Sequence, residues 1–350
     1  MSDDARTAAD PGTTTGGAVE DAVTCGDLRY SFGQVKAVDG LDLSVASGEI
    51  FGLLGPNGAG KSTVIRCVTT LLPVPPGMVR VFGHDAARER MAVRRLLGYV
   101  PQQLSADASL TGRENVALFA RLFDVSRRER SARVAEALEA VGLADAADRM
   151  ASTYSGGMVR RLELAQALIS APRLLMLDEP TIGLDPIART SVWEHITAVR
   201  AATGMTVLVT THYMDEAEQY CDRVALMHQG RIRALGTPEQ LVAELRARRD
   251  DGSTPTLEDV FRDVAGSGLD EEGGSSAMSN VPAGPRPALA DNPGDLGLDL
   301  LLIPPRARAG GACCPPGSPR CAWWSCRSCV TTGPSCTPVR SSCPVAADLR

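Results

Sequence analysis

The chain has 350 residues, of which 44% are hydrophobic and 22% are charged, and its formal net charge is −6. This balance is typical of a folded globular protein and unlike that of a disordered chain. No apolar run reaches the roughly 18 residues that a membrane-spanning helix requires, and the N-terminus lacks the basic start and apolar stretch of a signal peptide. Basic side chains do not cluster with aromatic ones, which argues against a nucleic-acid partner. We therefore expect a cytoplasmic protein without a membrane span of its own.

Composition divides the chain into a leader, a large globular unit and a C-terminal extension. Residues 1–21 are rich in Gly, Thr and Asp and show no period, which predicts a disordered leader. Residues 22–266 alternate short apolar runs with longer amphipathic stretches, as in an α/β fold whose sheet is covered by helices. The expected strands, several of them apolar enough to be buried on both faces, are Ile50–Leu54, Leu174–Leu177, Thr206–Thr210 and Val224–Met227.

Helical periodicity appears between and after these strands. The expected helices are Ser62–Leu72, Thr111–Phe123, Arg127–Val141, Gly157–Ile169, Pro238–Arg249 and Leu257–Val264. Three of them follow one another between residues of about 103 and 170. This grouping predicts an all-helical subdomain inserted into the α/β core.

The C-terminal extension changes composition twice. Residues 267–303 are rich in Gly, Ser, Pro and Asp, which predicts a linker. Residues 304–350 contain seven of the ten cysteines, and Cys326 and Cys329 form a CxxC pattern, which is half of a zinc site. Because no histidine lies near, we expect a tail without a fold of its own, with a zinc module as the alternative.

The strand Ile50–Leu54 runs into the phosphate-binding pattern G-x-x-x-x-G-K-[ST], and a helix is expected directly after it. Glycines allow backbone N–H groups to converge on phosphate oxygens, and the helix adds its positive N-terminal end. We expect Lys61 to reach the β- and γ-phosphates of ATP and Ser62 to supply a hydroxyl to Mg²⁺. The expected nucleotide-binding residues of this P-loop are Gly55, Pro56, Asn57, Gly58, Ala59, Gly60, Lys61, Ser62 and Thr63.

A second apolar strand, Leu174–Leu177, ends in the two carboxylates Asp178 and Glu179. This is the form of a Walker B strand, which delivers its aspartate to Mg²⁺. Glu179, one residue further, is placed to accept a proton from the water that attacks the γ-phosphate. The pattern therefore predicts hydrolysis as well as binding of ATP.

Tyr154-Ser155-Gly156-Gly157-Met158 precedes this strand by about twenty residues and opens a helix. The segment resembles the signature of the ABC ATPase family, with Ser155, Gly156 and Gly157 as the residues that meet a nucleotide. A hydroxyl, two close backbone amides and a helix N-terminus together suit an anion. The resemblance covers roughly residues 23–266.

Other positions match the family in order along the chain. Phe32 resembles the aromatic residue that stacks on adenine, with Tyr30 as the alternative. Gln102, rather than its neighbour Gln103, resembles the glutamine that senses Mg²⁺ and contacts the membrane partner. Asp185 resembles the D-loop aspartate, and His212 resembles the switch histidine that contacts the γ-phosphate.

The resemblance implies a P-loop core with an antiparallel β subdomain and the inserted helical subdomain. It also implies a peripheral protein at the cytoplasmic face of the membrane that acts as a homodimer or with a second ATPase subunit. ATP would bind with Mg²⁺ between the P-loop of one copy and the signature of the other. A separate integral membrane permease would be the partner in transport.

Three segments narrow the resemblance within the family. Tyr154–Met158, Thr211–Ala217 and Pro255–Phe261 look most like the ATPases of two-component bacterial exporters of the daunorubicin-resistance type. An importer ATPase and a soluble ABC ATPase that acts on ribosomes or DNA are the alternatives. Purification with a solute-binding protein would favour the importer. The sequence does not identify the transported molecule.

Overall fold

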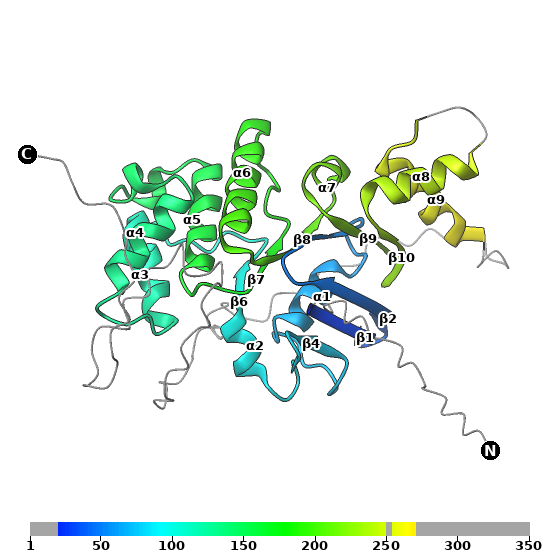
Figure 1. Cartoon of the computed structure of the whole chain (residues 1–350), viewed down its shortest axis with the longest axis horizontal. Coiled ribbons are helices and arrows are strands. Elements are labelled where there is room, and N and C mark those ends of the chain that lie inside the picture. Colours follow the sequence, from blue (N-terminus) through cyan, green and yellow to red (C-terminus); the bar gives the residue numbers. More distant parts are fainter. Residues whose placement is uncertain (1–19, 250–253, 271–350) are drawn as a thin grey trace, which may run out of the picture. The chain divides into compact units, whose positions relative to one another are not determined.

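The computed structural model describes residues 20–249 and 254–270 (Figure 1). Most of the predicted leader, the predicted zinc or unstructured tail and nearly all of the predicted linker lie outside these residues. The first described strand begins at Asp21, so the last residue assigned to the leader already belongs to the sheet. Its neighbour Glu20 forms an ion pair with Arg173, at 3.0 Å.

A six-stranded sheet forms the centre of the fold. Its strand order is β10-β9-β3-β8-β7-β6, and all neighbours are parallel except β10 with β9. Every residue of β3, β7 and β8 is buried, as expected for parallel strands covered on both faces. The strands are β3 (Ile50–Leu54), β6 (Leu97–Val100), β7 (Leu174–Asp178), β8 (Thr206–Thr211), β9 (Arg223–His228) and β10 (Arg231–Gly236).

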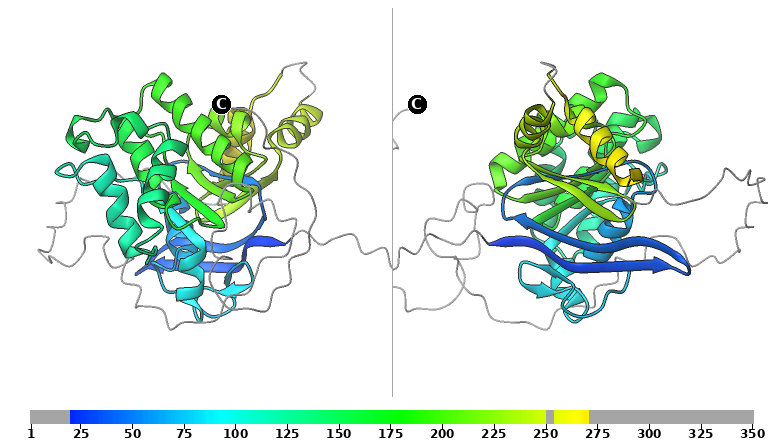
Figure 2. Two further views of the ribbon diagram at one scale, coloured as in Figure 1. Left: turned by 60° about the vertical axis from the view of Figure 1, so that its left-hand side comes forward. Right: turned by 90° about the vertical axis from the view of Figure 1, so that its right-hand side faces the viewer.

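An antiparallel sheet of order β2-β1-β4-β5 forms a second layer (Figure 2). Its strands are β1 (Asp21–Phe32), β2 (Val35–Ala46), β4 (Val79–Val81) and β5 (His84–Asp85). Helix α1 (Lys61–Val68) packs its apolar residues into the core that this sheet shares with the central one. Helix α2 (Arg90–Leu96) leads back into β6 of the central sheet.

Helices α3 (Gly112–Leu122), α4 (Arg130–Ala140) and α5 (Gly156–Leu168) pack against one another beside the central sheet. Figure 1 shows them together at the left of the view. Thr111 and Glu114 cap the start of α3 reciprocally through side chain and backbone. Two short 3₁₀ turns, Ala144–Ala146 and Ala151–Thr153, connect α4 with α5.

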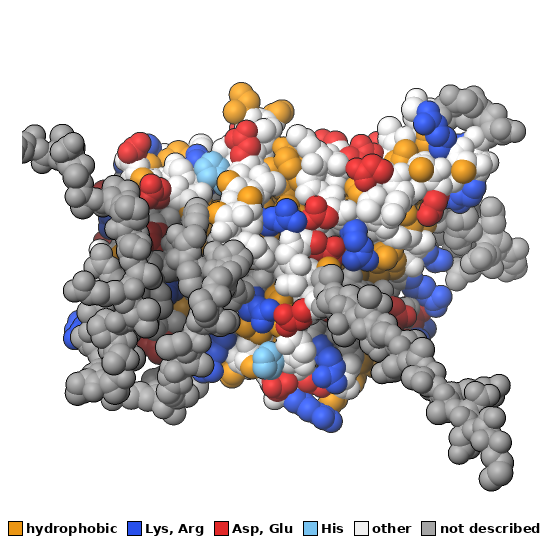
Figure 3. All heavy atoms as spheres, in the orientation of Figure 1, with side chains coloured by type: hydrophobic (Ala, Val, Ile, Leu, Met, Phe, Trp, Pro, Cys, Tyr) orange, Lys and Arg blue, Asp and Glu red, His pale blue; other side chains and the backbone are white. Residues whose placement is uncertain are grey.

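Four further helices follow the central strands. They are α6 (Pro186–Thr203), α7 (Met214–Tyr220), α8 (Pro238–Arg248) and α9 (Leu257–Asp270). Among residues 20–249 and 254–270, no helix combines the length and apolarity needed to cross a membrane. On the face drawn in Figure 3, basic and acidic side chains are interspersed.

The predicted α/β class with an antiparallel β part and a helical insertion is confirmed, but several helix ends were predicted wrongly. The helix after the P-loop ends at Val68 instead of Leu72, because Thr69 closes it and Thr70 adopts a left-handed φ of 62°. Helix α4 begins at Arg130 instead of Arg127, since residues 127–129 form a turn. Helix α9 runs to Asp270, four residues beyond the expected end of the globular unit at residue 266.

Candidate functional site

Four neighbouring parallel strands end at the same edge of the central sheet, and a predicted site residue follows or ends each one. β3 leads into the P-loop, β6 leads into Gln102, β7 ends at Asp178 and β8 leads into His212. Ligands of open α/β sheets bind at the carboxyl ends of such strands. The topology therefore brings together residues that are up to about 150 positions apart in the chain.

The P-loop is a tight turn that only glycine permits at two points. A Cβ on Gly55 would collide with the carbonyl oxygen of Met227, and a Cβ on Gly60 would collide with that of Ala37. Both glycines also have positive φ values, 154° and 105°. Gly60 caps α1, so the first helical residue, Lys61, follows the turn directly.

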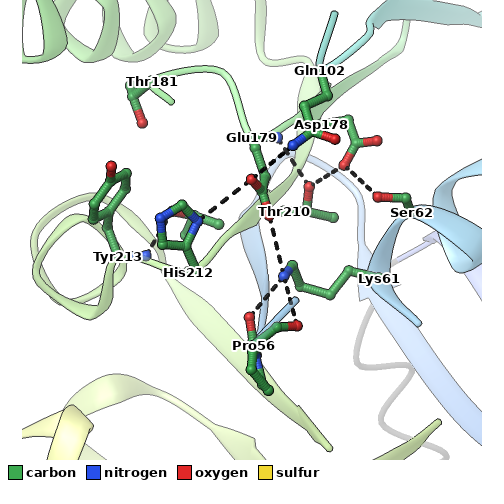
Figure 4. A network of polar contacts seen from close by, with 12 residues as sticks. Pro56, Lys61, Ser62, Gln102, Asp178, Glu179, Thr181, Thr210, His212 and Tyr213 are labelled. Carbon is green, nitrogen blue, oxygen red and sulfur yellow. Dashed lines mark hydrogen bonds and ion pairs between the residues drawn. The ribbon is translucent and has the colours of Figure 1, made fainter. Parts of the chain in front are cut away.

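Lys61 is 4% exposed and turns back over the loop from which it emerges. Its ammonium group donates to the carbonyl oxygens of Gly55, at 2.7 Å, and Pro56, at 3.2 Å. It also forms an ion pair with Glu179, at 3.2 Å (Figure 4). A buried ammonium beside the backbone N–H groups of a glycine-rich loop suits a phosphate chain.

Two oxygen ligands of the kind that Mg²⁺ prefers lie next to the loop. The hydroxyl of Ser62 donates to Asp178 Oδ1 at 3.2 Å, although the two residues belong to α1 and β7. Asp178 is 3% exposed. A carboxylate and a hydroxyl fit the way that Mg²⁺ is held together with phosphates in P-loop proteins.

Glu179 occupies the centre of the cluster. It is 5% exposed and has a left-handed φ of 50°, which a non-glycine residue adopts only when its surroundings impose it. Besides the ion pair with Lys61, its carboxylate accepts a hydrogen bond from Gln102 Nε2 at 3.2 Å. His212 Nδ1 lies 3.5 Å from the same oxygen, Oε2 (Figure 4). The turn therefore aims one carboxylate at three polar side chains from three other segments.

The aromatic candidates for adenine stacking lie at the end of β1. Phe32 is 49% exposed and contacts Tyr30 edge-on, with ring centroids 5.1 Å apart. Strand β2 follows the turn after Phe32, and its Ala37 is the residue that Gly60 of the P-loop approaches. The hairpin thus carries an exposed ring on the strand pair that borders the P-loop.

The signature residues lie outside the cluster around Glu179. Ser155 caps α5, and its hydroxyl accepts from the N–H of Met158 at 3.3 Å. Ser155 and Gly156 are exposed, whereas Gly157 is buried with no room for a Cβ beside Ala188 of α6. Asp185 caps α6 and is exposed as well. The predicted residues thus form two groups, one around Glu179 and one at the starts of α5 and α6.

Thr210 belongs to the first group, although no motif in the sequence includes it. Its hydroxyl donates to Asp178 Oδ1 at 2.6 Å and accepts from the N–H of Glu179 at 3.1 Å. It therefore orients both carboxylates. Beside them, burial and the charge of Asp178 raise the pKa of Tyr99 to about 12, which keeps this phenol neutral.

Glu216 of α7 was also missed. This carboxylate is 2% exposed and accepts hydrogen bonds from Thr181, at 2.7 Å, and Thr211, at 3.2 Å. These threonines lie next to the segments that carry Glu179 and His212. Burial raises the pKa of Glu216, and its hydrogen bonds and Arg189 oppose the shift. A glutamate four residues after the predicted switch histidine was the only signal in the sequence.

Replacing Thr210 by Val should lower ATP hydrolysis about 10-fold and destabilise the fold by about 1–2 kcal/mol. Valine keeps the shape of the side chain but leaves the hydrogen bonds of Asp178 and of the Glu179 N–H unmade. Steady-state hydrolysis at several Mg²⁺ concentrations and thermal unfolding measure the two effects. Thr190→Val, at an exposed position of α6, is the matched control. Equal kcat and unfolding temperature in both variants would show that Thr210 orients neither carboxylate.

Comparison with known proteins identifies the family of this chain. Residues 38–182 match the family model described as ABC transporter. The chain is 46% identical over 230 residues to the daunorubicin resistance ATP-binding protein DrrA3 of Streptomyces coeruleorubidus, an alignment that covers 66% of this chain and 72% of that protein. This chain belongs to the ABC transporter ATP-binding family.

Other relatives and solved structures agree with this assignment. This chain is 47% identical to the daunorubicin/doxorubicin resistance ATP-binding protein DrrA of Streptomyces peucetius, in an alignment that covers 64% of this chain and 68% of that protein. It is 44% identical to the Nod factor export ATP-binding protein I of Rhizobium meliloti, over 64% and 66%.

Among solved structures, an ATP-binding subunit of an ABC transporter matches with a TM-score of 0.60 at 28% identity, over 69% of this chain and 99% of that one. A dimeric ATP-binding cassette, MJ0796, in a post-hydrolysis state with ADP and Pi matches with a TM-score of 0.55 at 26% identity, over 61% and 98%. The chain is accordingly an ATP-binding subunit and an ATP hydrolase of the ABC type.

Proposed function

We propose that this ATPase powers the export of a drug-like or hydrophobic small molecule through a separate membrane permease. The observation that carries the proposal is the convergence of Lys61, Gln102 and His212 on Glu179, in a chain whose relatives are named for drug resistance and export. The P-loop, Asp178 and Glu179 account for the use of ATP. The relatives' names supply the direction of transport.

In the proposed mechanism, Glu179 accepts the proton of the attacking water while Lys61 binds the β- and γ-phosphates. His212 and Gln102, which both lie within 3.5 Å of Glu179, contact the γ-phosphate end. Ser62 and Asp178, with Gln102, would hold Mg²⁺, which when bound neutralises charge that develops on the phosphates. Phe32 would stack on the adenine.

The second group of site residues is proposed to serve the ATP of another subunit. Ser155 and Gly156 are exposed at the start of α5, where a helix N-terminus favours an anion. Near them, Asp185 is exposed and Ile187 is 83% exposed. Ile187 lies in the first turn of α6, directly after the capping residue Asp185 and Pro186. The dimeric structure of the related cassette MJ0796 supports the pairing of two subunits.

Coupling to the permease is proposed to run through the helical insertion and Gln102. A cleft of about 330 Å³ lies between the helical insertion and the core. The connection between α3 and α4 lines it on one side, and the end of α2 and the residues after α5 line it on the other. Phe123 and Val125 give it apolar walls, and Arg95 and Glu129 lie at its polar part. A cleft of mixed polarity between the insertion and the core suits a short segment of a partner protein.

Co-expression of the chain with a candidate membrane permease tests the proposal. In a drug-sensitive bacterial host, we expect accumulation of daunorubicin to fall only when both proteins are present. The fall should disappear when Glu179 is replaced by Gln in the ATPase. Uptake that rises and depends on a solute-binding protein would instead identify an importer and contradict the proposed direction.

A further inference from the structure

A buried ion pair links two segments that are assigned to different ATP sites. Arg160 and Glu163 lie one turn apart on α5, 2.9 Å from each other, and are 3% and 2% exposed. They follow the signature residues on the same helix. Their remaining polar contacts, however, are with the segment after β6 that carries Gln102.

Arg160 holds the backbone of this segment from one side. One guanidinium nitrogen donates to the carbonyl oxygen of Pro101, at 2.7 Å, and the other donates to that of Gln102, at 3.0 Å. The side chain of the same Gln102 donates to Glu179. The guanidinium therefore binds the backbone of Gln102, the residue whose side chain reaches the proposed catalytic carboxylate of Glu179.

Glu163 holds the segment from the other side. One of its carboxylate oxygens accepts from both the N–H and the hydroxyl of Ser105, and the other accepts from Arg160. Burial raises the pKa of Glu163, while Arg160 and the donors of Ser105 oppose the shift. Both ends of the segment 101–105 are thus tied to α5 by charge-assisted hydrogen bonds, the strong kind.

Burying an ion pair costs free energy of desolvation, and well-packed apolar residues of similar size are often at least as stabilising. What the pair adds is fixed geometry, since a guanidinium fork accepts few arrangements. Helix α5 can transmit that geometry. Ser155 lies five residues before Arg160, about 7.5 Å along the helix axis, and most residues of α5 are buried.

We propose that Arg160 and Glu163 are positioning residues that make the Gln102 segment and the signature residues Ser155–Gly157 move as one body. This proposal rests on the proposed function, and it gives Arg160 and Glu163 the role of coupling the sites of two ATP molecules. A shift of Gln102 at the ATP bound by one subunit displaces the signature that meets the ATP of the other subunit. The hydrogen bonds of the pair go to Pro101, Gln102 and Ser105 and not to the P-loop, so we expect its loss to leave nucleotide binding by the single chain unchanged.

The test uses the full chain and a neutral pair of the same size, Arg160→Gln with Glu163→Gln. We expect the dissociation constant for ADP, which the P-loop of one chain binds, to stay within about twofold of wild type. We expect kcat for ATP hydrolysis to fall about 10-fold, as for disruption of a coupling contact. The ATP concentration that drives dimerisation, measured by light scattering in a Glu179→Gln background, should rise by a similar factor.

Arg161→Gln is the matched control, because it removes the same charge from the next position of α5. Arg161 donates instead to the carbonyl oxygen of Val141, at 3.1 Å, within the helical group. We expect it to keep wild-type kcat and dimerisation. Arg160→Lys keeps the charge beside Glu163 but loses the fork, so it should fold and give an intermediate kcat even where the neutral pair destabilises the chain.

Wild-type kcat and dimerisation in Arg160→Lys and the folded neutral pair would overturn the proposal. Equal losses in ADP binding and kcat, or an equal loss in Arg161→Gln, would overturn it as well, because they indicate a general effect on folding. Failure of the proposed function would be seen in other measurements, made on the wild-type chain and on Glu179→Gln. It would be seen as unchanged accumulation of daunorubicin when the wild-type chain is co-expressed with the permease, and as a Glu179→Gln chain without an ATP-dependent dimer.

Discussion

Glu179→Gln is expected to lower kcat for ATP hydrolysis by about 10²- to 10⁴-fold, the usual contribution of a general base, while ATP still binds. Glutamine has the size of glutamate but cannot take a proton from water. Its amide can remain near Lys61 and Gln102, which contact the carboxylate at 3.2 Å each. Binding of ATP through the P-loop and Lys61 is therefore retained.

Hydrolysis would no longer reopen the dimer, so the Glu179→Gln chain should remain dimeric in the presence of ATP and Mg²⁺. Light scattering after gel filtration with and without ATP measures this state, and phosphate release measures kcat. Glu194→Gln makes the same chemical change on the exposed side of α6 and should behave as wild type. Hydrolysis at the wild-type rate in Glu179→Gln would contradict the assigned role of this carboxylate.

The sequence predicted four of the six described central strands, β3, β7, β8 and β9, because each is a short apolar run whose composition leaves few alternatives. Ile50–Leu54 has the predicted bounds, and the strands before Asp178 and His212 differ from prediction by one residue each. Helix ends were less predictable. The helix after the P-loop stops at Val68 because of a left-handed turn at Thr70, and nothing in the local apolar pattern signals that turn.

Site residues that belong to motifs were predictable because phosphate chemistry demands particular residue types at particular spacings. Lys61, Asp178 and Glu179 are of this kind, and the structure places all three within one cluster. Their chemical roles remain predictions. Residues that act through long-range contacts were not predictable, since a threonine or a glutamate in a helix or strand has many ordinary explanations.

Thr210 and Arg160 illustrate the difference. The role of Thr210 can be recognised only when β8 lies next to β7, because its hydroxyl then donates to Asp178 at 2.6 Å. Arg160 becomes meaningful only when α5 packs along the segment after β6. These neighbours are separated by 32 and by 58 or 59 residues, and only the folded chain reveals them.

Lys61→Gln should weaken ATP binding about 10- to 100-fold, the loss of one charged hydrogen bond to phosphate, and should abolish measurable hydrolysis at low ATP concentration. It should also lower the free energy of unfolding by about 1–3 kcal/mol. Lys61 is the cation that faces the buried Glu179, and its removal leaves that carboxylate with weaker partners. Calorimetric titration with ATP and thermal unfolding without nucleotide measure the two losses separately.

The chain provides its own control, because Lys36 and Lys61 are its only lysines. Lys36 is exposed and pairs with Asp39 at 3.7 Å, so Lys36→Gln should change neither ATP binding nor stability by more than a few tenths of a kcal/mol. ATP binding that is equally strong in both variants would contradict the assignment of Lys61 to the phosphates. The two losses in Lys61→Gln share one physical origin. In the proposed mechanism, the ammonium that pairs with Glu179 turns toward the phosphates when ATP binds, and that turn frees the carboxylate to accept the proton of water.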